Sequence, residues 1–254
     1  ETPRPIIVQS PMPIEAVEFF EKIENIGTEK SGTFVFYLGK IDDYPVILSK
    51  TGKGMVNGAA ATALAIEKYN PLAIINQGTS GGHHPDLYMY DIVLGKRTVN
   101  IGSFITGQRD DNEGIAPKDW KPMDLLASEG AVDEDSDVGI RYFKGDDKLL
   151  EAANAVKDKY QKGKIIEGTI GSADVWNREI DRIQWLHDLF DTDVEDMEAA
   201  AVAQVAASYD IPFLGIRILS NNITNQGEYK SDTAIANQEY VYQVVKQYIS
   251  SVRD

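Results

Sequence analysis

Apolar positions recur along the chain in two periods, which predict a succession of strands and helices. Short apolar or β-branched runs, typical of strands, occupy residues 6–9, 33–38, 44–49, 72–76, 91–94, 164–170 and 212–219. Apolar residues at helical spacing predict helices over 59–69, 147–160, 178–190, 196–208 and 238–252. Asp42 and Asp43 separate two of the strand-like runs, and this arrangement predicts a hairpin.

The alternation of strand-like and helix-like segments indicates the fold class. It predicts a single α/β domain over residues 1–254, with a central mixed, largely parallel sheet flanked by helices. The run 72–76 is almost wholly apolar and too short for a helix, so it suits a strand that is covered on both faces. Residues 106–137 lack a clear period and are rich in Asp, Gly and Pro. This stretch predicts a long functional or mobile loop.

Composition narrows the possible partners. The formal net charge is −15 and no basic stripe is present, which argues against nucleic acid and anionic membrane surfaces. The absence of cysteine excludes disulfides, thiolate metal sites and cysteine nucleophiles, and three histidines disfavour a histidine-rich metal site. No apolar run approaches the ~20 residues of a membrane span. The chain begins with Glu1, so the loss of a leader, and with it the compartment, stays open.

Unusual residues gather at five places where a predicted strand ends. In open α/β sheets, ligands bind beyond the carboxyl ends of the strands, so these places are read together. The five segments are residues 10–16, 78–82, 171–177, 194–201 and 217–222.

Each segment has a structural interpretation beside the functional one. Glu15 falls in the first turn of a helix, where a carboxylate is favourable in any case. The glycines of 78–82 form either a tight turn or a backbone that approaches a ligand closely. Trp176 is either a core residue or a cover for a flat ligand.

The last two segments pose the same choice. Glu198 precedes a run of alanines, so burial is expected, and a buried carboxylate needs a partner. Arg217 in an ion pair is one candidate partner, and the diol of a sugar is the other. Asn221 and Asn222 follow a core strand, where asparagine is also ordinary turn chemistry.

The order of these segments resembles the nucleosidase branch of the nucleoside phosphorylase/nucleosidase superfamily, most closely the 5′-methylthioadenosine/S-adenosylhomocysteine nucleosidases. The resemblance extends from about Ile6 to Tyr248 and rests on five elements together, none of which is specific alone. They are Met12-Pro13-Ile14-Glu15, Gly52-Lys53-Gly54, Gly78-Thr79-Ser80-Gly81-Gly82, Asp196-Met197-Glu198-Ala199-Ala200-Ala201 and Arg217-Ile218-Leu219-Ser220-Asn221.

The resemblance implies an enzyme that hydrolyses the N-glycosidic bond of a purine nucleoside, with no cofactor and no metal. Glu15 would be the general base that activates water, and Met197 and Glu198 would hold the ribose. The remaining residues that the resemblance assigns to the substrate are Met12, Ser80, Gly81, Val175 and Trp176. It further implies a homodimer, in which the loop 101–120 reaches the neighbouring pocket, and a cytoplasmic location.

Asn221 departs from the family pattern, which has Asp at this position to help protonate purine N7. An amide donates a hydrogen bond but cannot deliver a proton, so a 6-oxopurine nucleoside stays open as the substrate. Asn222 or Asp174 could instead take the role at N7.

The nucleophile, and catalysis itself, are the remaining choices. The first loop contains no arginine, and an anionic Glu15 would repel phosphate, so we favour hydrolysis over a purine nucleoside phosphorylase. A nucleoside-binding or storage protein of the same fold is the third reading, against which Glu15 and Glu198 argue.

Overall fold

The computed structural model describes residues 2–127 and 139–254. Within them, ten strands form one sheet of order β11-β6-β12-β13-β5-β1-β4-β3-β2, with β14 paired to both β5 and β6. The strands are β1 (Ile6–Ser10), β2 (Glu24–Ser31), β3 (Phe34–Ile41), β4 (Tyr44–Lys50), β5 (Ala73–Gly82), β6 (Ile92–Asn100), β11 (Tyr142–Lys144), β12 (Ile165–Ser172), β13 (Val194–Asp196) and β14 (Phe213–Asn221).

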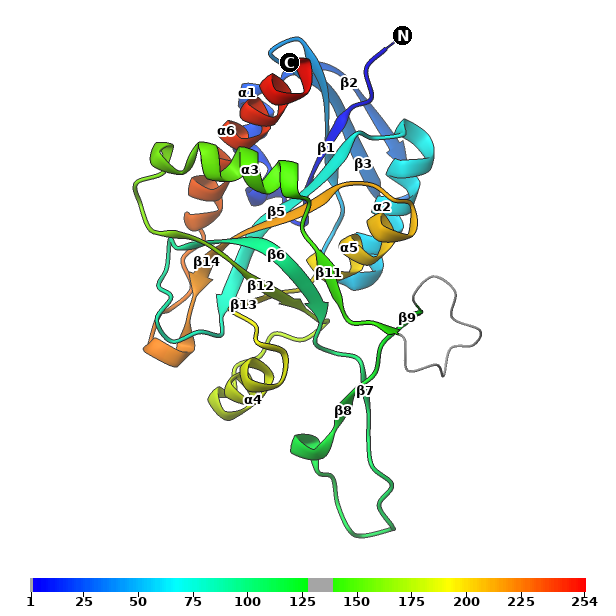
Figure 1. Cartoon of the computed structure of the whole chain (residues 1–254), viewed down its shortest axis with the longest axis vertical. Helices are drawn as coiled ribbons and strands as arrows, with labels where there is room; N and C mark the ends of the chain where they lie inside the picture. Colours follow the sequence, from blue (N-terminus) through cyan, green and yellow to red (C-terminus); the bar gives the residue numbers. More distant parts are fainter. Residues whose placement is uncertain (1, 128–138) are drawn as a thin grey trace.

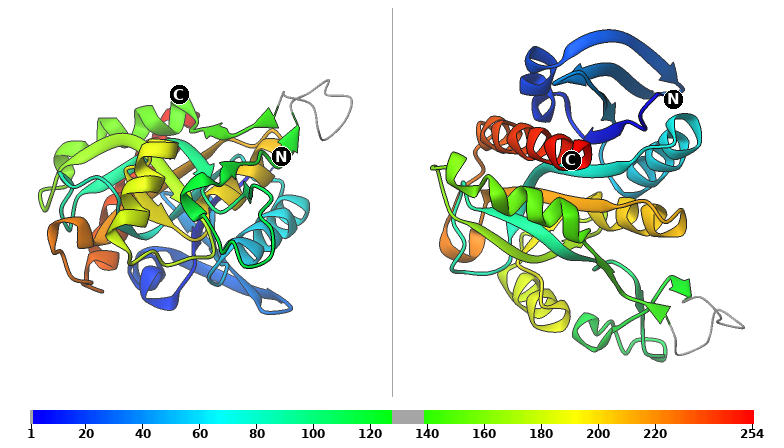
Figure 2. Two further views of the ribbon diagram at one scale, coloured as in Figure 1. Left: turned by 90° about the horizontal axis from the view of Figure 1, so that it is seen from below. Right: turned by 45° about the horizontal axis from the view of Figure 1, so that its top comes forward.

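Helices cover both faces of this sheet (Figure 1). They are α1 (Val17–Lys22), α2 (Met55–Tyr69), α3 (Asp147–Ala155), α4 (Ile180–Phe190), α5 (Ala199–Ser208) and α6 (Thr233–Arg253), with short 3-10 turns η1 (Pro13–Glu15), η2 (Pro117–Asp119), η3 (Lys157–Lys159) and η4 (Ile223–Asn225). One core lies under α1, α3 and α6, and a second lies under α2 and α5. Figure 2 shows α6 (red) beside α3 (green) on their shared face. None of the described helices has the length and apolarity that a membrane span requires.

Alternation along the central strands explains these two cores, which are the larger of the three hydrophobic clusters among the described residues. Ile6 and Val8 of β1 belong to the core under α6, whereas Ile7 belongs to the core under α2 and α5. Neighbouring side chains of a strand point to opposite faces, so a strand covered on both sides must be apolar throughout. The same rule applies to Ile74 and Ile75 of β5, which confirms the interpretation of the run 72–76.

The sheet is mixed, as the sequence predicts. Strands β4, β1, β5 and β14 are parallel to one another, and β6, β12 and β13 form a second parallel group. Antiparallel pairs β14–β6 and β13–β5 join the two groups. Strands β2, β3 and β11 add antiparallel pairing at the edges. The α/β fold class with helices on both faces is confirmed.

Several local predictions differ from the structure. Strand β2 was not predicted because its sequence is polar and mostly exposed, so it lacks an apolar period. The helix expected over 196–208 begins only at Ala199, since the Asp196 carboxylate accepts the backbone N–H groups of Glu198 and Ala199, each at 3.2 Å, and so precedes the first turn. The helix expected over 147–160 ends at Ala155 and continues as η3.

The aperiodic stretch 106–137 is described as far as residue 127, and its remainder lies outside the described residues. The described part carries η2, β8 (Lys121–Pro122) and β9 (Leu126–Ala127); β8 pairs with β7 (Phe104–Ile105) and β9 with β10 (Gly139–Ile140). The β7–β8 segment extends away from the sheet (Figure 1).

Candidate active site

A cavity of about 310 Å³ opens where the five segments singled out from the sequence meet. All five contribute to its lining, which confirms that they converge. The first four supply Pro11, Met12 and Glu15, then Thr79 to Gly82, then Val175 to Asn177, and then Glu195 to Glu198. The fifth supplies Arg217, Ser220 and Asn221, and other parts of the chain add Lys53, Ile183, Ile223 and Tyr229.

Glu15 lines this cavity with one free carboxylate oxygen. Its Oε2 accepts the backbone N–H of Thr79 at 2.8 Å. Its Oε1 is buried and has no hydrogen-bond partner within the described residues. Burial raises the pKa of Glu15 to about 7, although the positive charge of Arg217 and the Thr79 N–H pull it down. A carboxylate of this kind accepts a proton readily near neutral pH.

The backbone around Glu15 is built for this placement. A Cβ on Gly78 would lie 1.9 Å from Glu15 Oε2, and Gly78 has φ +152°, so only glycine fits beside the carboxylate. The backbone carbonyl of Glu15 accepts the Gln77 amide at 2.6 Å and the Ser10 hydroxyl at 3.0 Å. The side chain is therefore aimed by a fixed backbone.

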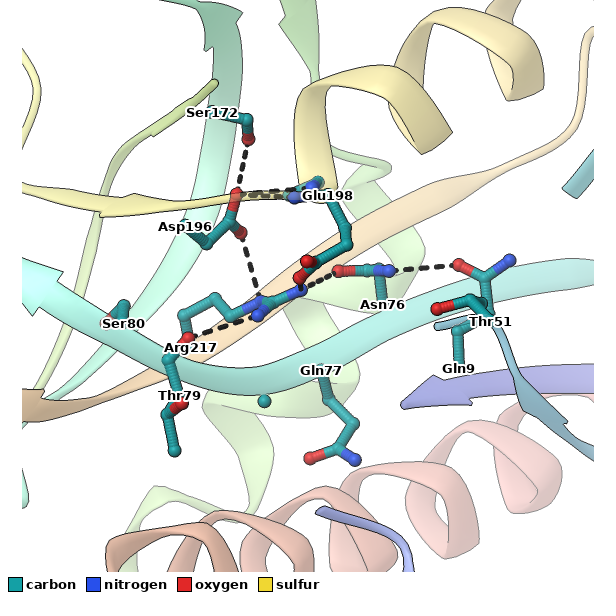
Figure 3. Close-up of polar contacts among 12 residues, drawn as sticks. Gln9, Thr51, Asn76, Gln77, Thr79, Ser80, Ser172, Asp196, Glu198 and Arg217 are labelled. Carbon is teal, nitrogen blue, oxygen red and sulfur yellow. Dashed lines mark hydrogen bonds and ion pairs between the residues drawn. The ribbon is translucent and has the colours of Figure 1, made fainter. Parts of the chain in front are cut away.

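Arg217 is 1% exposed and ties the carboxylates of the site together (Figure 3). Its Nη2 donates to Glu198 Oε1 at 3.1 Å and to the amide oxygen of Asn76, and its Nη1 donates to the carbonyl of Thr79 at 3.0 Å. Its Nε lies 3.0 Å from Asp196 Oδ2, at an angle that makes the contact an ion pair rather than a hydrogen bond. A buried charge needs such partners.

Glu198 forms the ion pair with Arg217 that the sequence offered as one interpretation, and its contacts leave room for the other. The ion pair with Arg217 is present, and Oε2 accepts the backbone N–H of Gly54 at 2.9 Å. Burial raises the pKa of Glu198, and Arg217 opposes the rise. Each carboxylate oxygen can accept a second hydrogen bond, and Glu198 lines the cavity, so it can also hold hydroxyl groups of a ligand.

Asn221, the last residue of β14, lines the cavity. Its Oδ1 accepts the Ser220 hydroxyl at 3.1 Å, and its Nδ2 has no acceptor within the described residues, so the amide N–H is available. Asn222 is fully buried and occupied, because it donates to the Leu87 carbonyl at 2.7 Å and accepts the Thr224 N–H at 3.2 Å.

The two alternatives to Asn221 are therefore placed elsewhere. Asp174 accepts the backbone N–H of Met55 at 2.8 Å. Neither Asp174 nor Asn222 is among the described residues that line the cavity.

Trp176 is not a core residue. Its side chain is 62% exposed, and its ring meets that of Tyr229 edge to face at 6.4 Å between centroids. Both rings line the cavity together with Val175, Met12 and Met197. This arrangement offers apolar and aromatic surface for a flat ligand.

The glycine-rich segment 78–82 is part of a strand and not a turn, because β5 continues to Gly82. Sequence reasoning took Ser80 and Gly81 from it and missed Thr79. Alternation along a strand puts Thr79 and Gly81 on one face, and Ser80 donates its hydroxyl to the Ile218 carbonyl at 2.8 Å. The alternation would have identified Thr79. Lys53 lies within the Gly52-Lys53-Gly54 element but was assigned no role, and nothing in the sequence pattern distinguishes Tyr229.

The chain belongs to the Phosphorylase superfamily, whose family model matches residues 5–250. A 5′-methylthioadenosine/S-adenosylhomocysteine nucleosidase of Bacillus thuringiensis subsp. konkukian is 29% identical over 205 residues, which are 79% of this chain and 78% of that protein. The family that the sequence resembles is thereby confirmed.

Solved structures share the fold over nearly the whole chain. The 5′-methylthioadenosine/S-adenosylhomocysteine nucleosidase of Neisseria meningitidis, in complex with methylthio-immucillin-A, is 24% identical with a TM-score of 0.77, over 96% of this chain and 99% of that one. Futalosine hydrolase of Helicobacter pylori is 18% identical with a TM-score of 0.76, over 96% and 97%. At these identities the likeness shows the fold alone. Among the described residues, no group of three or more His, Asp or Glu side chains could hold a metal ion.

Proposed function

We propose that this protein is a purine nucleosidase, which hydrolyses the N-glycosidic bond of adenosine-type nucleosides such as methylthioadenosine and S-adenosylhomocysteine. The similarity to named nucleosidases supports the substrate class. The observation that carries the reaction is the Oε1 of Glu15 inside the cavity, which has no partner in the part of the chain that the structure describes, beside an Arg217 that is paired with Glu198.

The reaction places opposite charges at the two ends of the cavity. As the bond between C1′ and N9 breaks, the bonding electron pair moves to the purine and positive charge builds on the ribose. Glu15 takes the proton of a water that attacks C1′, and the anionic Glu198 grips the ribose hydroxyls. Asn221 donates an N–H to purine N7, which stabilises the leaving base, and the base takes its final proton from solvent.

Water is the favoured nucleophile over phosphate. Arg217, whose positive charge acts on Glu15, is already matched by Asp196 and Glu198. The described lining holds four carboxylates, those of Glu15, Glu195, Asp196 and Glu198, against two cations, Lys53 and Arg217, so an incoming phosphate would meet an excess of negative charge. The alternative is a purine nucleoside phosphorylase acting on 6-oxopurines, for which the amide of Asn221 is the supporting feature. A non-catalytic nucleoside-binding protein would leave the aimed carboxylate of Glu15 without use.

Base release separates these functions. Adenosine, methylthioadenosine, S-adenosylhomocysteine and inosine are incubated with the enzyme, with and without phosphate, and free base is quantified by liquid chromatography. We expect release of adenine that does not depend on phosphate. Release that requires phosphate would establish the phosphorylase, and binding without release would establish the non-catalytic protein.

We further propose a homodimer built through the projecting segment 101–120. Ile105 and Ile115 of this segment are 58% and 82% exposed, so both offer apolar surface to a partner. A partner subunit would cover them. Light scattering at micromolar concentration should give twice the mass of the chain, and a monomer would contradict the proposal.

A further inference from the structure

Three neighbouring strands place Glu195, Gly81 and Asn221 in one row. Gly81 of β5 is in register with Glu195 of β13 on one side and with Asn221 of β14 on the other. A Cβ on Gly81 would lie 3.4 Å from Asn221 Nδ2 and 3.5 Å from Glu195 Cγ. All three residues line the cavity, so a bare backbone floor lies between a carboxylate and an amide.

The Glu195 carboxylate is held by the protein but not saturated. Its Oε1 lies 2.8 Å from His83 Nε2, and its Oε2 accepts the backbone N–H of Asn177 at 3.3 Å and the side-chain N–H at 3.1 Å. A carboxylate has about four acceptor sites. Contacts with described residues use three of them, and the fourth is on Oε1 of a side chain that borders the cavity.

His83 is fully buried beside Glu195, and both of its ring nitrogens have partners. It is 0% exposed, and its Nδ1 lies 2.7 Å from Thr192 Oγ1. Because a carboxylate only accepts hydrogen bonds, the contact with Glu195 requires the proton on Nε2. Its backbone N–H is bound to the Asp193 carbonyl at 2.9 Å. A buried imidazole fixed at both nitrogens sets the direction of the Glu195 carboxylate.

We propose that Glu195 determines base specificity by accepting an N–H from the purine, and that His83 is its positioning residue. The inference rests on the proposed function, since it assumes that the purine lies over Gly81. Asn221 offers a donor to an acceptor nitrogen of the base, and Glu195 offers only an acceptor. The site therefore selects a purine that carries an N–H donor on its ring edge, such as the 6-amino group of adenine or the N1–H of hypoxanthine.

Base analogues isolate this contact. 9-Methyladenine and 9-methylhypoxanthine each carry one kind of donor, whereas 9-methylpurine carries no N–H at all. Affinities for the wild-type enzyme are measured by calorimetric titration. Whichever of 9-methyladenine and 9-methylhypoxanthine binds more tightly should bind about 10- to 100-fold better than 9-methylpurine, because 9-methylpurine leaves a buried charged acceptor without its donor. Equal affinity for all three would overturn the proposal.

Variants assign the discrimination to Glu195. In Glu195→Gln the preference over 9-methylpurine should fall below about threefold, while the affinity for 9-methylpurine itself stays within about threefold of wild type. In His83→Gln the same preference should shrink, because Glu195 loses its support. His84→Gln and Glu151→Gln, which alter a neighbouring histidine and an exposed glutamate outside the lining, should leave it unchanged.

A uniform loss of affinity for all three ligands in Glu195→Gln, or an unchanged preference, would show that Glu195 only supports the cavity wall. The binding test needs no turnover. If the wild-type enzyme releases no base but still discriminates, the proposed function fails and the specificity assignment stands. If it releases base without discriminating, only the specificity assignment fails.

Discussion

Replacing Glu15 by glutamine should abolish hydrolysis and at the same time stabilise the fold at alkaline pH. Glutamine keeps the shape of the side chain and an oxygen for the Thr79 N–H, but it cannot take a proton from water. Loss of a general base typically lowers a rate by ~10²–10⁴-fold. We expect turnover to fall by this factor, whereas the affinity for a non-hydrolysable nucleoside analogue should be retained.

The gain in stability follows from the pKa of Glu15. Burial raises it from 4.5 to about 7, so the folded state holds the proton more tightly than the unfolded chain. Between these two values the unfolded chain has released the proton and the folded state has not, so the wild-type free energy of unfolding falls as pH rises through this window. Above pH 7 the full cost of the buried charge, about 3 kcal/mol, is present.

Glutamine carries no such charge. Urea unfolding should therefore give Glu15→Gln a free energy of unfolding up to about 3 kcal/mol above wild type at pH 8, with the difference vanishing near pH 4. Glu151→Gln, an exposed control on α3, should match wild type at both values. A difference that does not change with pH, or turnover close to wild type, would refute this reasoning about Glu15.

Other perturbations test the remaining parts of the site. Glu198→Gln should weaken nucleoside binding at least tenfold and free adenine binding less than threefold, measured by calorimetry; equal losses would mean a purely structural ion pair. Asn221→Asp should raise the turnover of adenosine roughly tenfold or more, a larger gain than for inosine, and should add an acidic limb to the pH profile. A lower turnover of adenosine would show that Asn221 does not contact purine N7. Gly78→Ala should reduce turnover at least about 100-fold by displacing Glu15, whereas Gly27→Ala, with open space around its Cβ, should not; equal rates in a chromatographic assay would contradict the close approach.

The sequence predicted the convergence of the site because apolar runs show where most core strands end. Glu15 and Asn221 each follow or end a strand that an apolar run marks, and parallel strands bring their ends together. Glu198 follows β13 (Val194–Asp196), which is no apolar run, so the alanines after Glu198 were the signal that singled it out. The core strands could be read for the same reason. Strand β2 could not, because an exposed edge strand with polar residues has no apolar period.

Apart from the ion pair of Glu198 with Arg217, which the sequence offered as one option, the contacts made by buried polar side chains could not be predicted. His83 and Glu195 are partners across 112 positions of sequence, and only the pairing of β13 with β5 brings them together. Thr79 was missed because the glycines around it suggested a turn, where strand alternation does not apply. The glycine at position 78 does not mark a turn. It is required because a Cβ there would lie 1.9 Å from Glu15 Oε2.

The fate of the sugar tests the central claim most directly. The enzyme is given methylthioadenosine in ¹⁸O-labelled water with phosphate present, and the sugar product is analysed by mass spectrometry as soon as it forms, with a no-enzyme control for exchange at C1′. Hydrolysis with Glu15 as the base predicts free 5-methylthioribose that carries one ¹⁸O and forms at the same rate when phosphate is left out. A sugar 1-phosphate without the label, formed only when phosphate is present, would contradict it.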